Sequence, residues 1–137
     1  MAKTWAEKMR APAPHVETTD KPFAGIPPGS KLLISSPAEI QAYLRRAVRR
    51  GATLDIRTMR DRLAKKHGAD AACPLSTSIF LRIVAEHAWE QLMQGVTIDD
   101  VAPFWRVVDP ASPLAKKLRA GPEWIAKQRA AESMQTA

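Results

Sequence analysis

The chain has 137 residues, of which 45% are hydrophobic and 26% are charged, and its net charge is +7 at pH 7. This length and composition are typical of one globular domain and exclude disorder throughout, because so many apolar side chains can form a core. There is no run of about 18 apolar residues, and the chain starts without the apolar segment of a secretory signal. We therefore expect no association with a membrane.

A single cysteine, Cys73, excludes an internal disulfide, and the three histidines lie far apart in the sequence. Cysteine usage of this kind is typical of a reducing compartment, so we expect a cytoplasmic protein, associated with the nucleoid if the source is a bacterium. Cys and His show no metal-ligand spacing. We therefore predict no metal site, and no bound cofactor is indicated.

Positive charge is concentrated in one part of the chain. Residues 37–70 hold nine Lys and Arg against four Asp and Glu, whereas residues 71–103 hold one against four. A concentrated basic surface attracts polyanions, above all nucleic acid, because phosphate contacts release counterions. The alternative, from charge alone, is a solvated basic face.

The start of the chain is rich in proline, with six of the 11 prolines in the first 37 residues. Proline lacks an amide donor and disfavours helix in the residue before it, so residues 10–31 are expected to be extended or looped. A short helical turn is predicted over residues 4–10. The apolar run over residues 31–35 favours a strand.

Two helices are predicted in the basic part. Ser36 is a suitable N-cap, with Pro37 after it and a Glu at the third helical position, and we expect this helix to end at Gly51. Apolar residues recur at three- and four-residue steps between these ends. The second helix is predicted from Asp55, its N-cap, to Gly68.

A third helix is predicted to begin at Ser76 or Thr77 and to end at Gly95, and a final helix is predicted over residues 122–132. Two helices joined by a Gly-containing connection have the general form of a helix-turn-helix, although any small helical bundle can produce the same pattern. The connection here is longer than the usual three or four residues.

These patterns divide the chain into three parts. Residues 1–36 are interpreted as a proline-rich extended segment that packs on the domain. Residues 37–132 form the helix-turn-helix domain, and residues 133–137 are expected to fray.

Four segments occur in the order found in the DNA-binding domain of methylated-DNA–protein-cysteine methyltransferases. These are Val48–Gly51, Asp55–Gly68, the helix from Ser76 and the cluster Pro103–Val108. The chain more closely resembles alkyltransferase-like relatives that have Pro-Tyr-Trp-Arg in place of the active-site Pro-Cys-His-Arg. The resemblance implies a mainly α fold, a winged-helix-like helix-turn-helix domain.

The closer resemblance extends over much of the remaining chain. It includes Lys3–Lys8, Ala64–Gly68, Cys73–Pro74 and Ser76–Phe80. A resemblance to these relatives implies a protein that binds DNA but does not repair it.

The differences from the family affect its chemistry. Phe104 stands at the position of the acceptor cysteine, and Trp105 stands at that of the histidine beside it. A phenyl ring has no nucleophile, so we expect no alkyltransferase activity. Ile56 and Thr77 stand at or near the positions of the tyrosine that rotates the target nucleotide and of the arginine that fills the gap.

We therefore predict a non-catalytic alkyltransferase-like protein that binds double-stranded DNA and senses alkylated or distorted bases. The side chains expected to contact DNA are basic or carry a hydroxyl: Arg45, Arg49, Arg57, Arg60, Lys65, Lys66, Ser76, Thr77 and Ser78. The predicted base or lesion pocket comprises Pro103, Phe104, Trp105 and Arg106, where the aromatic rings either stack on a base or fill the core.

Two other function classes remain open at this point. The same fold can serve as a protein-interaction module with the old active-site pocket packed shut. An enzyme with different chemistry has less support, because no acid–base or nucleophile set is visible.

Overall fold

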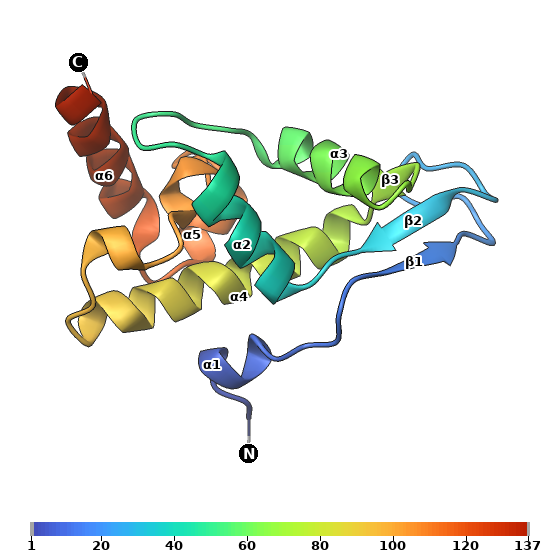
Figure 1. The fold of residues 1–137 in the computed structure, drawn as a ribbon, viewed down its shortest axis with the longest axis horizontal. Helices are drawn as coiled ribbons and strands as arrows, with labels where there is room; N and C mark the ends of the chain where they lie inside the picture. Colours follow the sequence, from blue (N-terminus) through green and yellow to red (C-terminus); the bar gives the residue numbers. More distant parts are fainter. Residues whose placement is uncertain (1, 137) are drawn as a thin grey trace.

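The computed structural model describes residues 2–136, and helices provide most of its regular structure (Figure 1). In chain order the elements are α1 (Trp5–Lys8), β1 (His15–Thr18), β2 (Lys31–Ile34), α2 (Pro37–Ala47), α3 (Ile56–Lys66), β3 (Ala71–Ala72), α4 (Pro74–Met93), the 3-10 turns η1 (Ile98–Asp100) and η2 (Phe104–Arg106), α5 (Pro113–Lys117) and α6 (Gly121–Thr136). The prediction of a mainly helical fold is confirmed, with a small three-stranded sheet added.

The sheet has the order β1-β2-β3, with β2 in the centre. β1 and β2 are antiparallel, with His15 opposite Ile34, and β2 and β3 are parallel, with Leu32 opposite Ala71. The predicted strand over residues 31–35 is confirmed as β2. β1 lies within the segment expected to be extended, whereas β3 was not predicted.

Helix α2 begins as predicted, because the Ser36 hydroxyl accepts a hydrogen bond from the amide of Glu39 at 3.1 Å. It ends at Ala47 rather than at Gly51. Val48 is extended and buried, so the chain leaves the helix to place this side chain in the core. Gly51, with φ of +83°, lies in the turn that follows.

Helix α3 has the predicted N-cap, since the Asp55 carboxylate accepts a hydrogen bond from the Thr58 amide at 2.7 Å. Helix α4 begins at Pro74, before the predicted start at Ser76 or Thr77. Proline at the first helical position requires no amide partner, and the Cys73 sulfur accepts a hydrogen bond from the amide of Ser76 at 3.5 Å. Cys73 is therefore the cap of this helix.

The end of the chain is more helical than predicted. Ser112 caps the unpredicted helix α5 by accepting a hydrogen bond from the Ala115 amide at 3.2 Å. Helix α6 continues to Thr136, so residues 133–136, which were expected to fray, are helical. Residue 137 lies outside the described residues.

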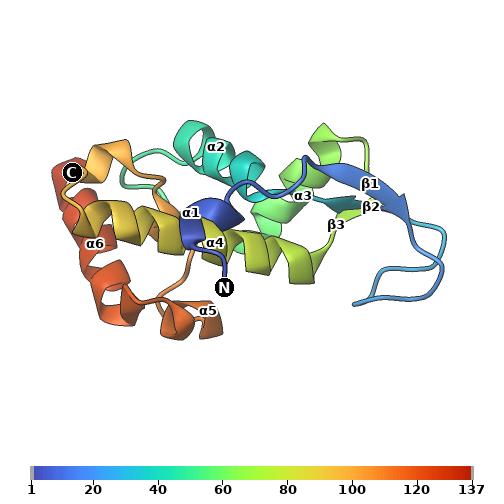
Figure 2. The same ribbon diagram turned by 90° about the horizontal axis from the view of Figure 1, so that it is seen from below.

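Helix α4 lies in the middle of the molecule and packs against α1, α2 and η2 (Figure 2). Its buried side chains include Leu81, Val84 and Ala88, which join apolar residues of α2 and α3 in one core. Helix α6 packs against α5 and η2 at the other end of the core. This arrangement brings the start of α3, the start of α4 and residues 107–114 together.

Candidate nucleic-acid interface

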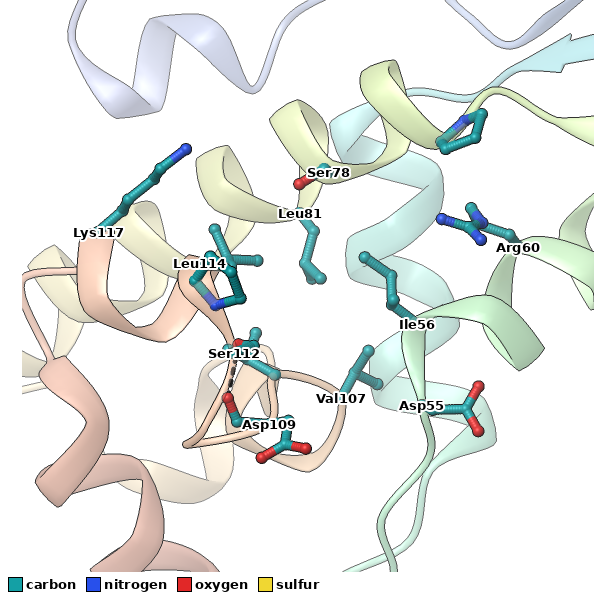
Figure 3. A pocket seen from close by; sticks show the side chains of 13 residues that line it. Asp55, Ile56, Arg60, Ser78, Leu81, Val107, Asp109, Ser112, Leu114 and Lys117 are labelled. Atoms are coloured by element: carbon teal, nitrogen blue, oxygen red, sulfur yellow. Dashed lines mark hydrogen bonds between the residues drawn. The ribbon is translucent and has the colours of Figure 1, made fainter. Parts of the chain in front are cut away.

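A pocket of about 490 Å³ lies where these three segments meet (Figure 3). Its lining is mostly apolar with charged groups at its edge: Asp55, Ile56, Arg60, Pro74, Ser78, Leu81, Val107, Val108, Asp109, Ser112, Pro113, Leu114 and Lys117. Ser78 and Leu81 point into it from α4, and Arg60 and Lys117 lie on opposite sides (Figure 3). Its volume is within the range of small-molecule sites in proteins, roughly 300–1,000 Å³.

The edge of the pocket carries charges of both signs. Asp55 and Asp109 line it together with Arg60 and Lys117. Hydrogen bonds from Thr58, the backbone amide first, lower the pKa of Asp55, so this carboxylate is ionised at neutral pH. Carboxylates accept hydrogen bonds from base amino groups, and cations bind phosphates, so the edge has partners for both parts of a nucleotide.

The segment 104–108, of which Val107 and Val108 line the pocket, is held in place by Arg106 and α6. Arg106 Nε donates to Glu132 Oε2 at 3.0 Å, and its Nη2 donates to Glu132 Oε1 at 2.8 Å. A third donor of this guanidinium, Nη1, reaches the carbonyl of Val48 at 2.9 Å. Arg129 donates to the carbonyls of Trp105 at 2.6 Å and Val108 at 2.9 Å. Both arginines therefore fix the backbone that carries the two pocket valines.

Glu132 is ionised within this cluster although its side chain is only 5% exposed. Burial alone would raise its pKa, but hydrogen bonds from Arg106 and from Trp105 Nε1, at 2.9 Å, stabilise the carboxylate. The net effect is a pKa below the ordinary 4.5. Neither Glu132 nor Arg129 was identified from the sequence, because each acts on a segment more than 20 residues away.

Phe104 and Trp105 form part of the core, with 0% and 1% of their surface exposed. The Phe104 ring stacks on Trp124 at 5.7 Å between centroids, and the Trp105 ring meets Trp124 edge-on at 5.6 Å. Pro103 is also buried. The rings therefore lack an open face for a base, and the core-filling alternative describes them. The 490 Å³ pocket is lined by the two residues that follow the segment 103–106, Val107 and Val108.

The basic residues named from the sequence are divided between two regions. Arg57 and Arg60 lie one turn apart on α3, and only Arg60 lines the pocket. At the other end of the same helix, Lys65 is exposed and Lys66 Nζ lies 3.4 Å from Glu39 Oε2. The pocket therefore brings only part of the predicted basic set to one place.

The remaining predicted cations lie near the end of α2. Arg45 donates a hydrogen bond to the carbonyl of Asp100 at 3.2 Å, and Arg49 is exposed in the turn after α2. Arg106, which was predicted to line the lesion pocket, does not line the 490 Å³ pocket, and its guanidinium is bound to Glu132.

The three hydroxyl residues at the start of α4 have different environments. Ser78 lines the pocket. Thr77 is fully buried, which contradicts its expected role as a DNA contact: the helix starts two residues earlier than predicted, and this face packs into the core. The hydroxyls of Ser76 and Thr77 are buried without a hydrogen-bond partner among the described residues.

Two classes of site find no support in the described part of the chain. Residues 2–136 contain no group of three or more His, Cys, Asp or Glu side chains positioned to bind a metal ion. None of the helices in this range combines the length and the apolar character that a membrane crossing requires.

Comparisons of the chain with known protein families, with curated proteins and with solved structures found no match. The family resemblance in the sequence motifs therefore remains a hypothesis.

Proposed function

We propose that this chain is a non-catalytic, alkyltransferase-like protein that binds double-stranded DNA and admits an extruded base to the pocket at the start of α3 and α4. In this proposal α3 and α4 act as the two helices of a winged-helix-like helix-turn-helix, and β1 and β2 supply the hairpin beside it. The observation that carries the proposal is the 490 Å³ pocket edged by Arg60 and Lys117.

The lining of this pocket suits a flat, polar-edged ligand. Ile56, Leu81 and Leu114 supply apolar contacts for the faces of a base, and Ser78 supplies a hydroxyl for its edge. Arg57, exposed one turn before Arg60, extends the positive charge along α3 for the phosphates.

The same proposal includes the absence of alkyl-group transfer to the protein. No Cys or His is among the residues that line the pocket. Cys73 is buried, and its sulfur caps α4. A thiol that is buried and occupied in this way is a poor nucleophile for a ligand in the pocket.

The alternative of a protein-interaction module with the old pocket packed shut is supported by the burial of Phe104 and Trp105. The open pocket next to them, with cations at its edge, favours DNA. An acidic protein partner for the same basic face remains the second candidate.

Charge reversal on α3 tests the DNA-binding proposal. Arg57→Glu with Arg60→Glu is expected to weaken duplex binding and to flatten the plot of log K against log salt by about 0.9 for each phosphate that the protein no longer neutralises. Fluorescence anisotropy at two or more salt concentrations measures both effects. Lys127→Glu, an exposed position on α6, is the control and is expected to keep the wild-type slope. Unchanged affinity and slope in the double variant would contradict the assignment of α3 to the interface, and a wild type without salt-dependent duplex binding would favour the protein-interaction module.

A further inference from the structure

A second cavity, of about 400 Å³, lies between α3 and the loop that joins β1 to β2. The loop contributes residues 24–26, and α3 contributes Arg57 and Arg60. Arg60 and Pro74 line this cavity and the first pocket as well. The two cavities are therefore adjacent parts of one surface, separated by two side chains.

The loop is held in a defined shape by hydrogen bonds at its base. Thr19 Oγ1 donates to the carbonyl of Pro27 at 3.0 Å and accepts from the Ser30 amide at 3.0 Å. Ser30 Oγ donates to the same Pro27 carbonyl at 2.6 Å. Such a loop can bind a ligand without a large loss of its own conformational entropy.

The tip of the loop is a tight turn. The amides and carbonyls of Phe23 and Ile26 form two reciprocal hydrogen bonds, at 3.0 and 2.7 Å. Between them, Ala24 and Gly25 have φ of +50° and +82°. Ala24 is thus held in the left-handed region, which is uncommon for a residue with a side chain. The turn presents the Phe23 ring with 40% of its surface exposed.

The charges of the second cavity suit a phosphate. Arg57 and Arg60 face it one helical turn apart, and Asp61 is the acidic residue in the same lining, so positive charge is in excess. Guanidinium groups bind phosphate oxygens through paired N–H donors. Phe23 precedes the lining residue Ala24 in the sequence and is exposed at the tip of the loop. Exposed aromatic rings stack on unpaired or flanking bases, and nearby cations bind the backbone of the same strand.

We propose that this second cavity is a subsite for the nucleotide next to the extruded one on the same DNA strand. Arg57 and Arg60 bind its phosphate, and the Phe23 ring stacks on its base. Because the cavities share Arg60 and Pro74, a strand whose base occupies the first pocket continues directly into the second. This inference rests on the proposed DNA-binding function and adds the loop of residues 19–30 to the interface.

The test replaces the ring and leaves the hairpin intact. Phe23→Ala is compared with Val16→Ala, a matched control on the same hairpin with 41% exposure. On a duplex containing an alkylated guanine, Phe23→Ala is expected to weaken binding about 5- to 150-fold, the usual range for one base–aromatic stack. Val16→Ala is expected to bind as the wild type does. Phe23→Tyr, which keeps the flat ring, is expected to restore affinity.

Truncated duplexes locate the contact. Two duplexes are used. One ends at the alkylated nucleotide on its 5′ side, and the other ends at it on its 3′ side. The wild type is expected to lose affinity on one of them, and Phe23→Ala is expected to lose nothing further there. Melting temperatures of the variants establish that each is folded.

Equal affinities for Phe23→Ala and Val16→Ala on the full duplex would overturn the subsite. A loss that is the same on every truncated duplex would also overturn it. Lys117→Glu, at the edge of the first pocket and outside the second, distinguishes the two failures: if it weakens duplex binding, DNA binding stands without the subsite. If it does not, the proposed function itself fails.

Discussion

Glu132→Gln is expected to lower the free energy of unfolding by about 3–5 kcal/mol, because it leaves the Arg106 guanidinium buried without its counter-charge. The Arg106 side chain is only 12% exposed and is bound to Glu132 through two hydrogen bonds. Urea unfolding at pH 7 measures the change. Glu123→Gln, at an exposed position of the same helix, is the control and is expected to change stability little.

The same carboxylate makes stability depend on pH. Its folded pKa lies below the ordinary 4.5, so its contribution is present above that value and is lost as the pH falls through the lowered pKa. Glu39 acts in the same direction, since hydrogen bonds from Ser35 and His67 outweigh burial and lower its pKa. The acid side of the stability curve should therefore be less steep in Glu132→Gln than in the wild type. An identical acid profile in the two proteins would contradict the ion pair.

Trp105→Ala is expected to destabilise the fold by about 3–5 kcal/mol, as large-to-small changes of a buried aromatic residue usually do. The ring is packed between Phe104 and Trp124, and its indole N–H donates to Glu132. Thermal and urea unfolding measure the loss. Trp105→Phe keeps an aromatic ring but removes the indole donor, so a smaller loss is expected.

DNA binding by the Trp105 variants separates a core residue from a stacking residue. Because the ring is in the core, affinities for plain and alkylated duplex are expected to fall together, in parallel with the melting temperature. A selective loss of affinity for the alkylated duplex at unchanged stability would show that Trp105 stacks on the base after all.

The helices could be predicted from the sequence because their signals are local. Ser36 and Asp55 cap α2 and α3 as expected, and their apolar residues recur with helical spacing. The predicted helix ends were less accurate where a tertiary contact determines the position at which the helix begins or ends. Val48 leaves α2 to enter the core, and Cys73 rather than Ser76 or Thr77 caps α4.

Features that depend on distant segments could not be predicted in the same way. The strand β3 has two residues and exists through its pairing with β2, about 40 positions earlier. The predicted lesion pocket, residues 103–106, does not line the 490 Å³ pocket: Pro103, Phe104 and Trp105 are buried in the core, and the next two residues after this segment, Val107 and Val108, line the pocket instead. That division depends on how η2 turns and on Arg106 and Arg129, whose contacts span more than 20 residues.

Binding of plain and alkylated duplex by a pocket-filled variant tests the central claim most directly. Ser78 points into the pocket, so Ser78→Trp places a large ring where the extruded base is proposed to lie (Figure 3). Ser78→Ala, which removes the hydroxyl without filling the space, is the control. Anisotropy titration of the wild type is expected to show tighter binding of the alkylated duplex. Ser78→Trp is expected to lose this preference and keep its affinity for plain duplex, since phosphate contacts dominate that affinity. Equal affinity of the wild type for both duplexes, or a preference that survives in Ser78→Trp, would contradict the account.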